Sequence, residues 1–239
     1  MENAGYTTLT RHSSLMREMQ IIANNIANAS TGGFRSENMV FSEYISDLDG
    51  TAPSLSMAAG NARFASSMQG GVEQTDGTFD FAIQGDGFFL IETPEGDALT
   101  RAGSFTPSDT GELVTSDGLR VLDAGGAPIF IPPDAQSLSV AADGTLSADG
   151  RPLSQIGLWR PADDTDLVRR EGVMFTLRNP PEPVENGVIL QGFLEGSNVD
   201  PISQMARMIE VQRAYELGQS FLEEEHGRIR NVLSTLGRP

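Results

Sequence analysis

The residue types that most often carry catalysis are sparse in this chain. A Ser-His-acid triad needs a histidine within hydrogen-bond reach of a serine, and the sequence has two histidines, His12 and His226. Both lie in segments with helical periodicity, where no turn would expose a nucleophile. His12 falls on an apolar stripe, which favours a packed or interfacial residue over a catalyst. His226 follows three glutamates, a pattern typical of a solvated face, so neither histidine predicts a catalytic site.

Carboxylate clusters are the next candidates. The densest group, Asp163, Asp164 and Asp166, follows Pro161 in a segment that we expect to be a solvent-facing loop. Glycosidases instead use two separated carboxylates in a rigid cleft. The fragment Asp47-Leu48-Asp49-Gly50 resembles the start of an EF-hand loop, but the downstream glutamate ligand is missing. These acids therefore predict neither a glycosidase site nor a calcium site.

Other catalytic and cofactor motifs are absent from the sequence. It has no phosphate-binding loop, nucleophile elbow or H-E-x-x-H helix, and it contains no lysine and no cysteine. The glycine-rich run at 84–87 precedes Phe88 and Phe89 in a strand pattern, which indicates a hairpin turn and not a dinucleotide fingerprint. We predict that the protein is not an enzyme and has no catalytic, cofactor-binding or metal site.

The charge is large and unevenly distributed. The formal net charge is −17, from 33 acidic and 16 basic residues, which argues against a nucleic acid partner. Residues 1–45 carry four acids and three arginines, residues 199–239 carry six and five, and the middle carries 23 and eight. Nearly neutral ends suit packing against partners, and an acidic centre suits a solvated surface; a role in solubility alone is the alternative.

No segment reads as a membrane anchor or a cleaved secretion signal. No apolar run approaches the roughly 20 residues of a membrane span, so we predict no lipid-inserted segment. Residues 1–6 lack the basic start and apolar core of a secretory signal. If the protein leaves the cytoplasm, another export route is expected.

A long helix is predicted from Pro201 to Leu236. Asp200 is placed as its N-cap, proline suits the first helical position, and Gly237 and Pro239 mark its end. At 1.5 Å per residue it would be about 54 Å long, so it needs a partner. Its apolar stripe repeats every seventh residue, at Met208, Tyr215, Leu222, Ile229 and Leu236, with Val211 and Val232 at the companion position.

That companion position is incomplete, because Gly218 and Glu225 separate the two valines. A two-stranded zipper formed by this helix alone is therefore disfavoured. A second helical pattern, from about Thr7 to Asn28, provides a partner within the chain, and Gly32 and Gly33 end it. Its stripe contains Leu9, Met16 and Ala23 with His12, Met19 and Ile26, broadened by Leu15 and Ile22.

The end of this first helix is rich in asparagine. Asn24, Asn25 and Asn28 are expected to point away from the apolar seam. Amides that donate and accept hydrogen bonds suit a packed lateral contact, whereas asparagine also commonly ends helices. Both interpretations stay open from the residues alone.

Between the helices the sequence predicts an arm and a β domain. Residues 36–70, rich in Gly, Ala, Ser and Pro, are expected to form a linker or extended arm, with a plain surface loop as the alternative. From residue 71 onward Asp-Gly pairs at 76–77, 86–87, 117–118, 143–144 and 149–150 predict tight turns between antiparallel strands. The expected strands are Phe79–Ile83, Phe88–Ile91, Leu119–Leu122, Ile129–Ile131, Leu138–Val140, Ile156–Trp159, Met174–Leu177 and Val188–Leu190.

The predicted fold class is α+β. Paired, coiled-coil-like N- and C-terminal helices form a discontinuous domain, into which a mostly antiparallel β domain is inserted. The expected boundaries are 1–35 for the first helix, 36–70 for the arm, 71–197 for the β domain and 198–239 for the second helix.

Several motifs resemble those of the flagellar rod and hook proteins. The N-terminal one runs from Ile22 to Arg35 and includes Gly33 and Phe34. The C-terminal one covers 194–201, with Asn198 and Asp200, and continues through 208–216. Segments 82–91 and 100–106 resemble the middle-domain motifs of the hook and the longer rod proteins. The resemblance covers nearly the whole chain.

The resemblance implies a structural subunit of the flagellar basal-body rod. Such proteins are exported by the flagellar type III apparatus and polymerise with copies of themselves and with other rod proteins. Their terminal helices form the inner layers of a torque-transmitting tube in the periplasmic space. Gly196 and the short length favour the proximal-rod members, whereas Gln212-Arg213-Ala214-Tyr215 is also typical of distal-rod members. A secreted β-rich adhesin, a tail-like structural protein and an acid-dependent hydrolase are the alternatives.

Overall fold

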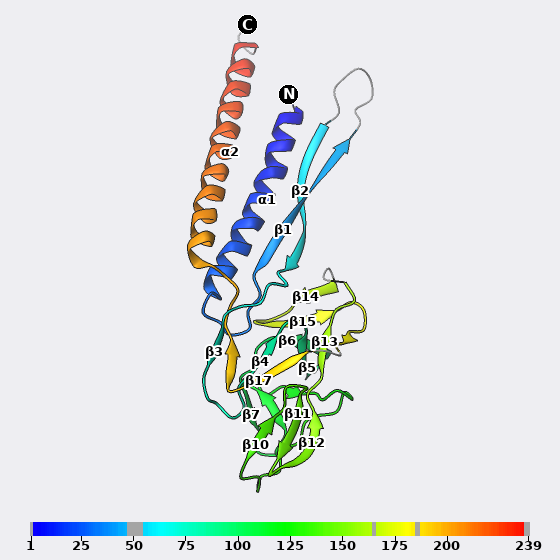
Figure 1. Cartoon of the computed structure of the whole chain (residues 1–239). Coiled ribbons are helices and arrows are strands. Elements are labelled where there is room, and N and C mark those ends of the chain that lie inside the picture. Colours follow the sequence, from blue (N-terminus) through cyan, green and yellow to red (C-terminus); the bar gives the residue numbers. More distant parts are fainter. Residues whose placement is uncertain (1, 47–54, 164–165, 185–186, 237–239) are drawn as a thin grey trace. The chain divides into compact units, whose positions relative to one another are not determined.

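The computed structural model describes residues 2–46, 55–163, 166–184 and 187–236, and it describes side-chain surroundings for these residues except 2–7, 41–46, 55–62, 233 and 236. The calcium-like fragment at 47–50 and Asp164 lie outside the described residues. Within these ranges a long helix comes first in the chain, a series of strands follows, most of them short, and a second long helix comes last (Figure 1). This arrangement confirms the predicted mixed α+β class.

The chain forms two compact units, and each unit is built from segments that are not consecutive in the sequence. The helical unit comprises Met1–Ala27, Glu37–Arg63 and Asp200–Pro239, and the β unit comprises Asn28–Ser36 and Phe64–Val199. The helical unit contains α1 (Glu2–Ala27), α2 (Pro201–Leu236), β1 (Glu37–Ser46) and most of β2 (Leu55–Ala65).

Helix α2 has the predicted bounds, because its start is fixed by local chemistry. The backbone N–H of Ile202 donates to Asp200 Oδ1 at 3.1 Å, and the Ser203 hydroxyl donates to Asp200 Oδ2 at 2.5 Å. The Ser203 hydroxyl, followed by the Ile202 N–H, lowers the pKa of Asp200 below its ordinary value. Asp200 is therefore the N-cap that the sequence predicts. Helix α1 starts earlier than the expected Thr7, since the apolar periodicity used to place it begins only at Leu9.

Strands occupy part of the segment expected to be a linker or arm. β1 and β2 pair with each other as a two-stranded sheet in the described residues. Met39-Val40-Phe41 and Tyr44-Ile45 give β1 the apolar, β-branched and aromatic residues that favour strands. Composition over the whole of 36–70 obscured this local preference. An extended arm agrees with two long strands better than a plain loop does.

The β unit contains the remaining strands, and its described strand pairs are antiparallel. Its largest sheet runs β14-β15-β6-β5-β9-β8-β7 in the described residues, with β13 pairing β5 and β16. The bounds are β3 (Val72–Gln74), β4 (Phe81–Gln84), β5 (Phe88–Thr93), β6 (Gly96–Thr100), β7 (Phe105–Pro107), β8 (Leu113–Thr115), β9 (Arg120–Val121), β10 (Leu138–Val140), β11 (Thr145–Ala148), β12 (Arg151–Gln155), β13 (Leu158–Arg160), β14 (Leu167–Arg169), β15 (Met174–Leu177), β16 (Glu182–Pro183), β17 (Val188–Gln191) and β18 (Phe193–Glu195).

The main core of the β unit gathers buried apolar residues from many of these short strands. Phe81, Phe89 and Phe105 form ring contacts at its centre, with centroids 5.3 to 6.0 Å apart. The prediction of a strand at 129–131 is wrong, because Phe130 forms only an isolated β-bridge with Glu112 and these three residues form no strand. Ile129 and Ile131 are nevertheless buried, so their apolar character reflects packing of a loop and not strand pairing.

Candidate assembly site

Helices α1 and α2 pack along one face, in opposite directions (Figure 1). Leu15, Ile22 and Val211 form the buried centre of the contact. Half-buried neighbours pack around them, namely Met19, Ile26, Met208, Ala214 and Tyr215. The predicted pairing of the two stripes is therefore present as a helix-helix contact inside the helical unit.

Polar contacts fix the register of the two helices. Glu18 is buried and accepts a hydrogen bond from Arg207 Nε at 2.8 Å and forms an ion pair with Arg207 Nη2 at 2.7 Å. His12 stacks on the Tyr215 ring with centroids 3.9 Å apart, and its Nε2 lies 2.8 Å from the Tyr215 carbonyl oxygen. His12 is thus a packed interfacial residue, as the sequence predicts.

One of the two predicted heptad positions on α1 faces away from α2. Leu9 is 55% exposed, Met16 is 43% exposed, and Ala23 is also exposed. The contact instead uses His12, Leu15, Met19, Ile22 and Ile26, whose spacing alternates between three and four residues. The expectation that Leu9, Met16 and Ala23 lie in the seam between the two helices is therefore corrected, because Leu15 and Ile22 take that position.

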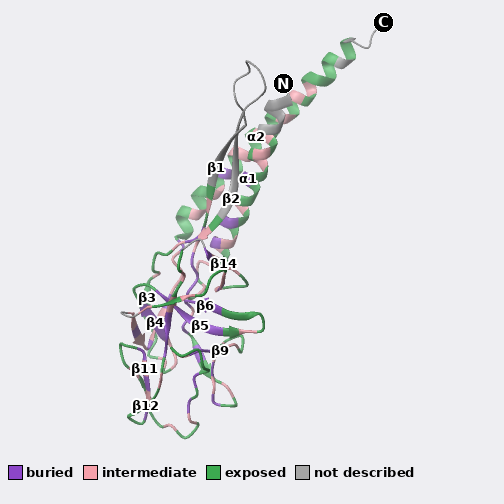
Figure 2. Ribbon diagram, turned by 90° about the vertical axis from the view of Figure 1, so that its right-hand side faces the viewer, coloured by how far each residue is buried: buried purple, intermediate pink, exposed green. Residues whose placement is uncertain are grey.

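The predicted stripe on α2 divides into a covered and an uncovered part. Met208, Val211, Tyr215 and Leu222 are buried or half-buried. Ile229 and Val232, in the same heptad positions, are 50% and 51% exposed, and the side chain of Leu236 lies outside the described residues. Figure 2 shows mostly exposed residues along this last part of α2.

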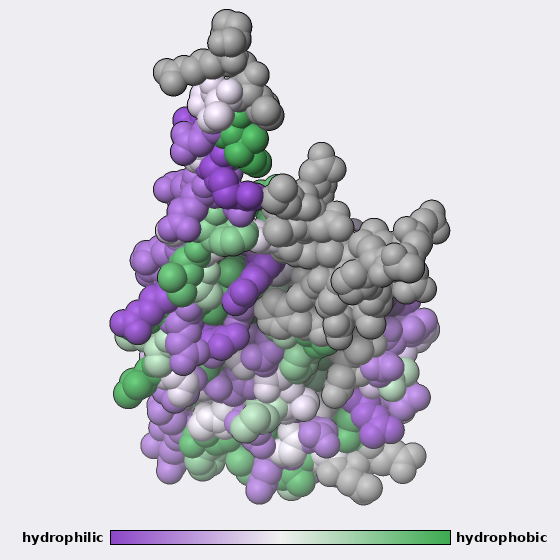
Figure 3. Space-filling view, turned by 90° about the horizontal axis from the view of Figure 1, so that it is seen from above, coloured by the Kyte–Doolittle hydropathy of each residue, from purple (hydrophilic) through white to green (hydrophobic). Residues whose placement is uncertain are grey.

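Helix length explains the uncovered part. The side-chain contacts between the helices place the start of α1 opposite about residue 225 of α2, so roughly eleven residues, or ~16 Å, extend past it. α1 has 26 residues and α2 has 36. α2 also exposes Ile202, Met205, Ile209, Leu217 and Phe221, and Figure 3 shows hydrophobic patches among the hydrophilic surface of the helical unit.

The asparagines at the end of α1 serve both roles that the sequence left open. Asn25 is buried and makes a lateral contact: its Nδ2 donates to the Glu37 carbonyl at 2.9 Å, and its Oδ1 accepts from the Glu37 N–H at 2.9 Å. Its Nδ2 also lies 3.3 Å from Gln204 Oε1 on α2. Asn28 follows the helix and accepts from the Thr31 hydroxyl at 3.2 Å, and Asn24 is half-buried.

The other predicted motif residues lie in the β unit, where three separate motifs meet. Gly33 has φ 70°, and its N–H donates to the Glu195 carbonyl at 2.7 Å. Phe34 is buried beneath the Arg169 guanidinium, which lies 4.3 Å from its ring centre. Asn198 accepts from the Ser36 N–H at 2.6 Å and donates to the Met68 carbonyl at 2.7 Å.

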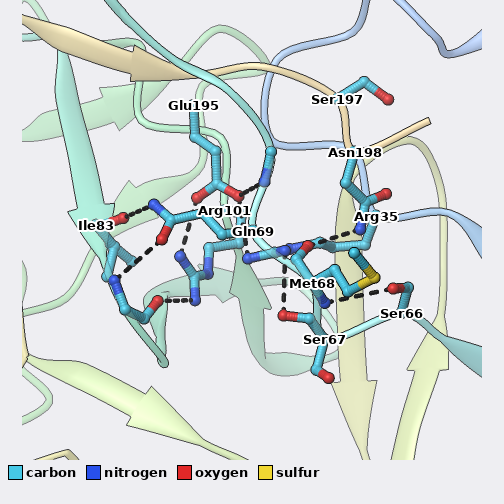
Figure 4. Close-up of polar contacts among 12 residues, drawn as sticks. Arg35, Ser66, Ser67, Met68, Gln69, Ile83, Arg101, Glu195, Ser197 and Asn198 are labelled. Carbon is cyan, nitrogen blue, oxygen red and sulfur yellow. Dashed lines mark hydrogen bonds and ion pairs between the residues drawn. The ribbon is translucent and has the colours of Figure 1, made fainter. Parts of the chain in front are cut away.

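At the centre of this junction lies a buried ion triad that the sequence did not predict (Figure 4). Glu195 bridges two arginines: Arg35 Nη2 lies 3.0 Å from Oε1, and Arg101 Nη1 donates to Oε2 at 2.9 Å. All three side chains are at most 2% exposed. The Arg35 contact is an ion pair without hydrogen-bond alignment, whereas Arg101 also donates to the Gly85 carbonyl at 2.7 Å.

Burial dominates the electrostatics of this triad. Desolvation, reinforced by the neighbouring Arg101, lowers the pKa of Arg35 to about 10 in spite of Glu195. Desolvation likewise lowers the pKa of Arg101. The two arginines also border a cavity of about 560 Å³. Because the carboxylate and nearby carbonyls hold their guanidinium groups, we interpret them as structural cross-links between motifs. Each of the three motifs that resemble rod and hook proteins contains one of these charged residues, and this was the one feature of the sequence that pointed to the triad.

One expectation about surface acids is wrong. Asp166 is buried and accepts a hydrogen bond from Asn179 Nδ2 at 2.8 Å, and its N–H donates to the Asp163 carbonyl. Asp163 itself is exposed. His226 is exposed, as expected for a solvated face.

Among the described helices, none combines the length and apolar content needed to cross a membrane.

Three families of flagellar proteins match separate parts of this chain. Residues 6–35 match the flagella basal body rod protein family, residues 82–148 the D1 domain of flagellar hook protein FlgE/F/G, and residues 190–234 the C-terminal region of flagellar basal body rod FlgEFG proteins. These matches include most of both terminal helices and the three residues of the ion triad, Arg35, Arg101 and Glu195.

Full-length relatives agree with these matches. The chain is 35% identical to flagellar basal-body rod protein FlgF of Rhizobium meliloti over 99% of both chains. It is 38% identical to FlgF of Caulobacter vibrioides over all of this chain and 99% of the relative. It is 33% identical to rod protein FlgG of Bacillus subtilis over 88% of this chain and 90% of the relative.

Proposed function

This chain belongs to the flagellar basal-body rod protein family and is a structural subunit of the flagellar rod, and on that basis we propose where it lies and how it assembles. We propose that it occupies the proximal rod, within the periplasmic space, and contributes to the tube that transmits torque. Its FlgF relatives support this position, since they match along almost their whole length.

A distal-rod position is the second candidate, because FlgG also aligns with most of the chain. Complementation separates the two. Expression in a strain that lacks its own FlgF should restore motility, and expression in a strain that lacks FlgG should not. Rescue of only the FlgG-deficient strain would reverse the assignment.

We propose that the terminal helices are the assembly surface. The main support for this proposal is that α2 continues past the start of α1 and leaves Ile229 and Val232 half exposed. Apolar residues at seven-residue spacing on a helix are normally covered by another helix. We propose that α1 and α2 form a coiled-coil-like pair within the subunit, and that copies of the chain and other rod proteins cover the rest. The three-four spacing of the α1 contact residues supports that pairing.

Export by the flagellar type III apparatus is part of the same proposal. It rests on the family to which the chain belongs. The chain has no cysteine, so no disulfide would have to be opened before an unfolded chain passes through a narrow channel. Secretion of this chain should stop in a strain whose flagellar export gate is inactive. Continued secretion there would contradict this route.

The assembly proposal is tested by placing a charge on the uncovered stripe. Ile229→Asp should leave α2 helical, because Ile229 lies outside the buried cluster that joins the helices. It should prevent incorporation into rods, since a carboxylate would be desolvated at the contact. Rods are isolated and probed for the chain, and swimming is scored in soft agar.

Asn231→Asp is the matched control, because Asn231 is an exposed polar residue on the same stretch of α2. It adds the same charge away from the apolar stripe and should leave assembly intact. Circular dichroism of both purified variants checks that the helices persist. Normal rod incorporation of Ile229→Asp would refute assembly through this stripe.

A further inference from the structure

Two apolar surfaces of the helical unit are left uncovered by the chain's own packing. We call Leu9, Met16 and Ala23 the outer stripe of α1, and Ile229 and Val232 the overhang of α2. All five residues are exposed. Together they carry the heptad positions that the contact between α1 and α2 does not use.

The overhang continues the surface that binds α1. Ile229 stands seven residues after Leu222, and Val232 stands two heptads after Gly218 and three after Val211. Val211 packs against α1, Leu222 is half-buried one heptad after Tyr215, and a Cβ added at Gly218 would lie 2.8 Å from His12 Cδ2. The overhang therefore fits a helix that presents apolar residues at seven-residue spacing, as α1 does.

The outer stripe has that spacing, and in its own chain it points away from α2. At 100° per residue, Leu9, Met16 and Ala23 fall on one side of α1, turned away from Leu15 and Ile22. The outer stripe of a chain thus cannot cover the overhang of the same chain. The charges beside the two surfaces are complementary. Arg17 is exposed beside Met16 on the outer stripe, and Glu223 and Glu224 are exposed just before the overhang.

We propose that the overhang of one chain packs on the outer stripe of a second copy. This inference rests on the proposed rod function and names the two surfaces that would meet. Because the surfaces differ, each copy can offer one and receive the other, which produces an open array and not a closed dimer. Leu9 lies near the level of Gly218, so copies that point the same way would be displaced by roughly 20 Å along the helix axis.

Cysteine cross-linking tests this contact directly, because the natural chain contains no cysteine. The double variant Leu9→Cys with Val232→Cys is expressed in place of the natural chain, and isolated rods are oxidised. Each copy would then join two neighbours, so a ladder of oligomers is expected on non-reducing gels. Met16→Cys with Glu225→Cys is a second pair in the same register, because each of its residues stands one heptad from the first pair, and it should also give a ladder.

The matched control is Leu9→Cys with Ser220→Cys, because Ser220 is exposed on the opposite side of α2 from the overhang. It should give monomers. Each single variant should give no more than dimers. Rods that contain the double variants but yield no ladder from either pair would overturn the inference, as would an equal ladder from the Ser220 control. Neither result would affect the rod assignment, which complementation of the FlgF- and FlgG-deficient strains tests separately.

Discussion

Glu195→Gln is the most informative single change in the β unit. The substitution keeps the shape of the side chain but removes the one carboxylate shared by two buried arginines. Arg35 would lose its ion pair at 3.0 Å and Arg101 its charge-assisted hydrogen bond at 2.9 Å. The Gly70 N–H, which donates to Oε1 at 3.0 Å, would face an uncharged amide.

The expected loss follows from burial. Removing one partner of a buried ion pair costs about 3–5 kcal/mol, because the remaining charge stays desolvated. Since two guanidinium groups at most 2% exposed depend on this carboxylate, we expect the upper part of that range. With a urea slope of about 2 kcal/mol per molar, the unfolding midpoint should fall by roughly 2 M.

Trp159 provides the assay. It is the single tryptophan of the chain and lies in β13, packed against the second core cluster of the β unit. Its fluorescence therefore reports unfolding of that unit during urea titration. The control is Glu182→Gln, which removes an exposed ion pair to Arg160 and should cost less than about 1 kcal/mol. If Glu195→Gln unfolds within about 1 kcal/mol of the natural protein, the triad does not hold the motifs together.

Three further predictions concern glycines and the helix cap. Gly33→Ala should destabilise the β unit by at least about 2 kcal/mol, because φ is 70° and the new Cβ would lie 2.3 Å from the Ala102 nitrogen; Gly71→Ala, with open space, is the control in urea titration. Gly227→Ala should raise the helix melting temperature, and Gly218→Ala should not, since its Cβ would approach His12. Folding depresses the pKa of Asp200, so its contribution is present above pH 3.8 and lost as pH falls through the folded pKa; Asp200→Asn should flatten that acid loss of helical circular dichroism.

The helices could be predicted from the sequence because local signals define them. Asp200 and Pro201 mark the start of α2, and its seven-residue stripe needs no knowledge of other segments. The stripe of α1 that faces α2 was harder to predict from the sequence. Leu9, Met16 and Ala23 repeat as regularly as His12, Met19 and Ile26, and only the buried Leu15 and Ile22 decide between them.

The strands were harder to predict where pairing, and not local residues, decides the structure. β6 (Gly96–Thr100) has no alternating pattern, yet its last three residues are buried between β5 and β15. The run Ile129–Ile131 has the opposite problem, since its apolar residues pack in the core without forming a strand.

The ion triad could not be predicted because charged residues are usually exposed. Arg35, Arg101 and Glu195 are far apart in the chain, and only the folded β unit brings them together. Each lies in a motif that resembles those of rod and hook proteins. The resemblance thus marked the right segments without indicating that their charges are buried against one another.

The contact between Asn25 and Glu37 has a consequence for unwanted association. The amide of Asn25 takes both backbone hydrogen bonds of the first residue of β1, which are the bonds a third strand would make. Exposed strand edges recruit strands from other molecules and promote aggregation. A helix side chain closes this edge where β1 begins, so a foreign strand that paired along β1 would have to stop short of Glu37. The same amide near the end of the N-terminal helix therefore limits edge-to-edge joining of two copies at the start of β1.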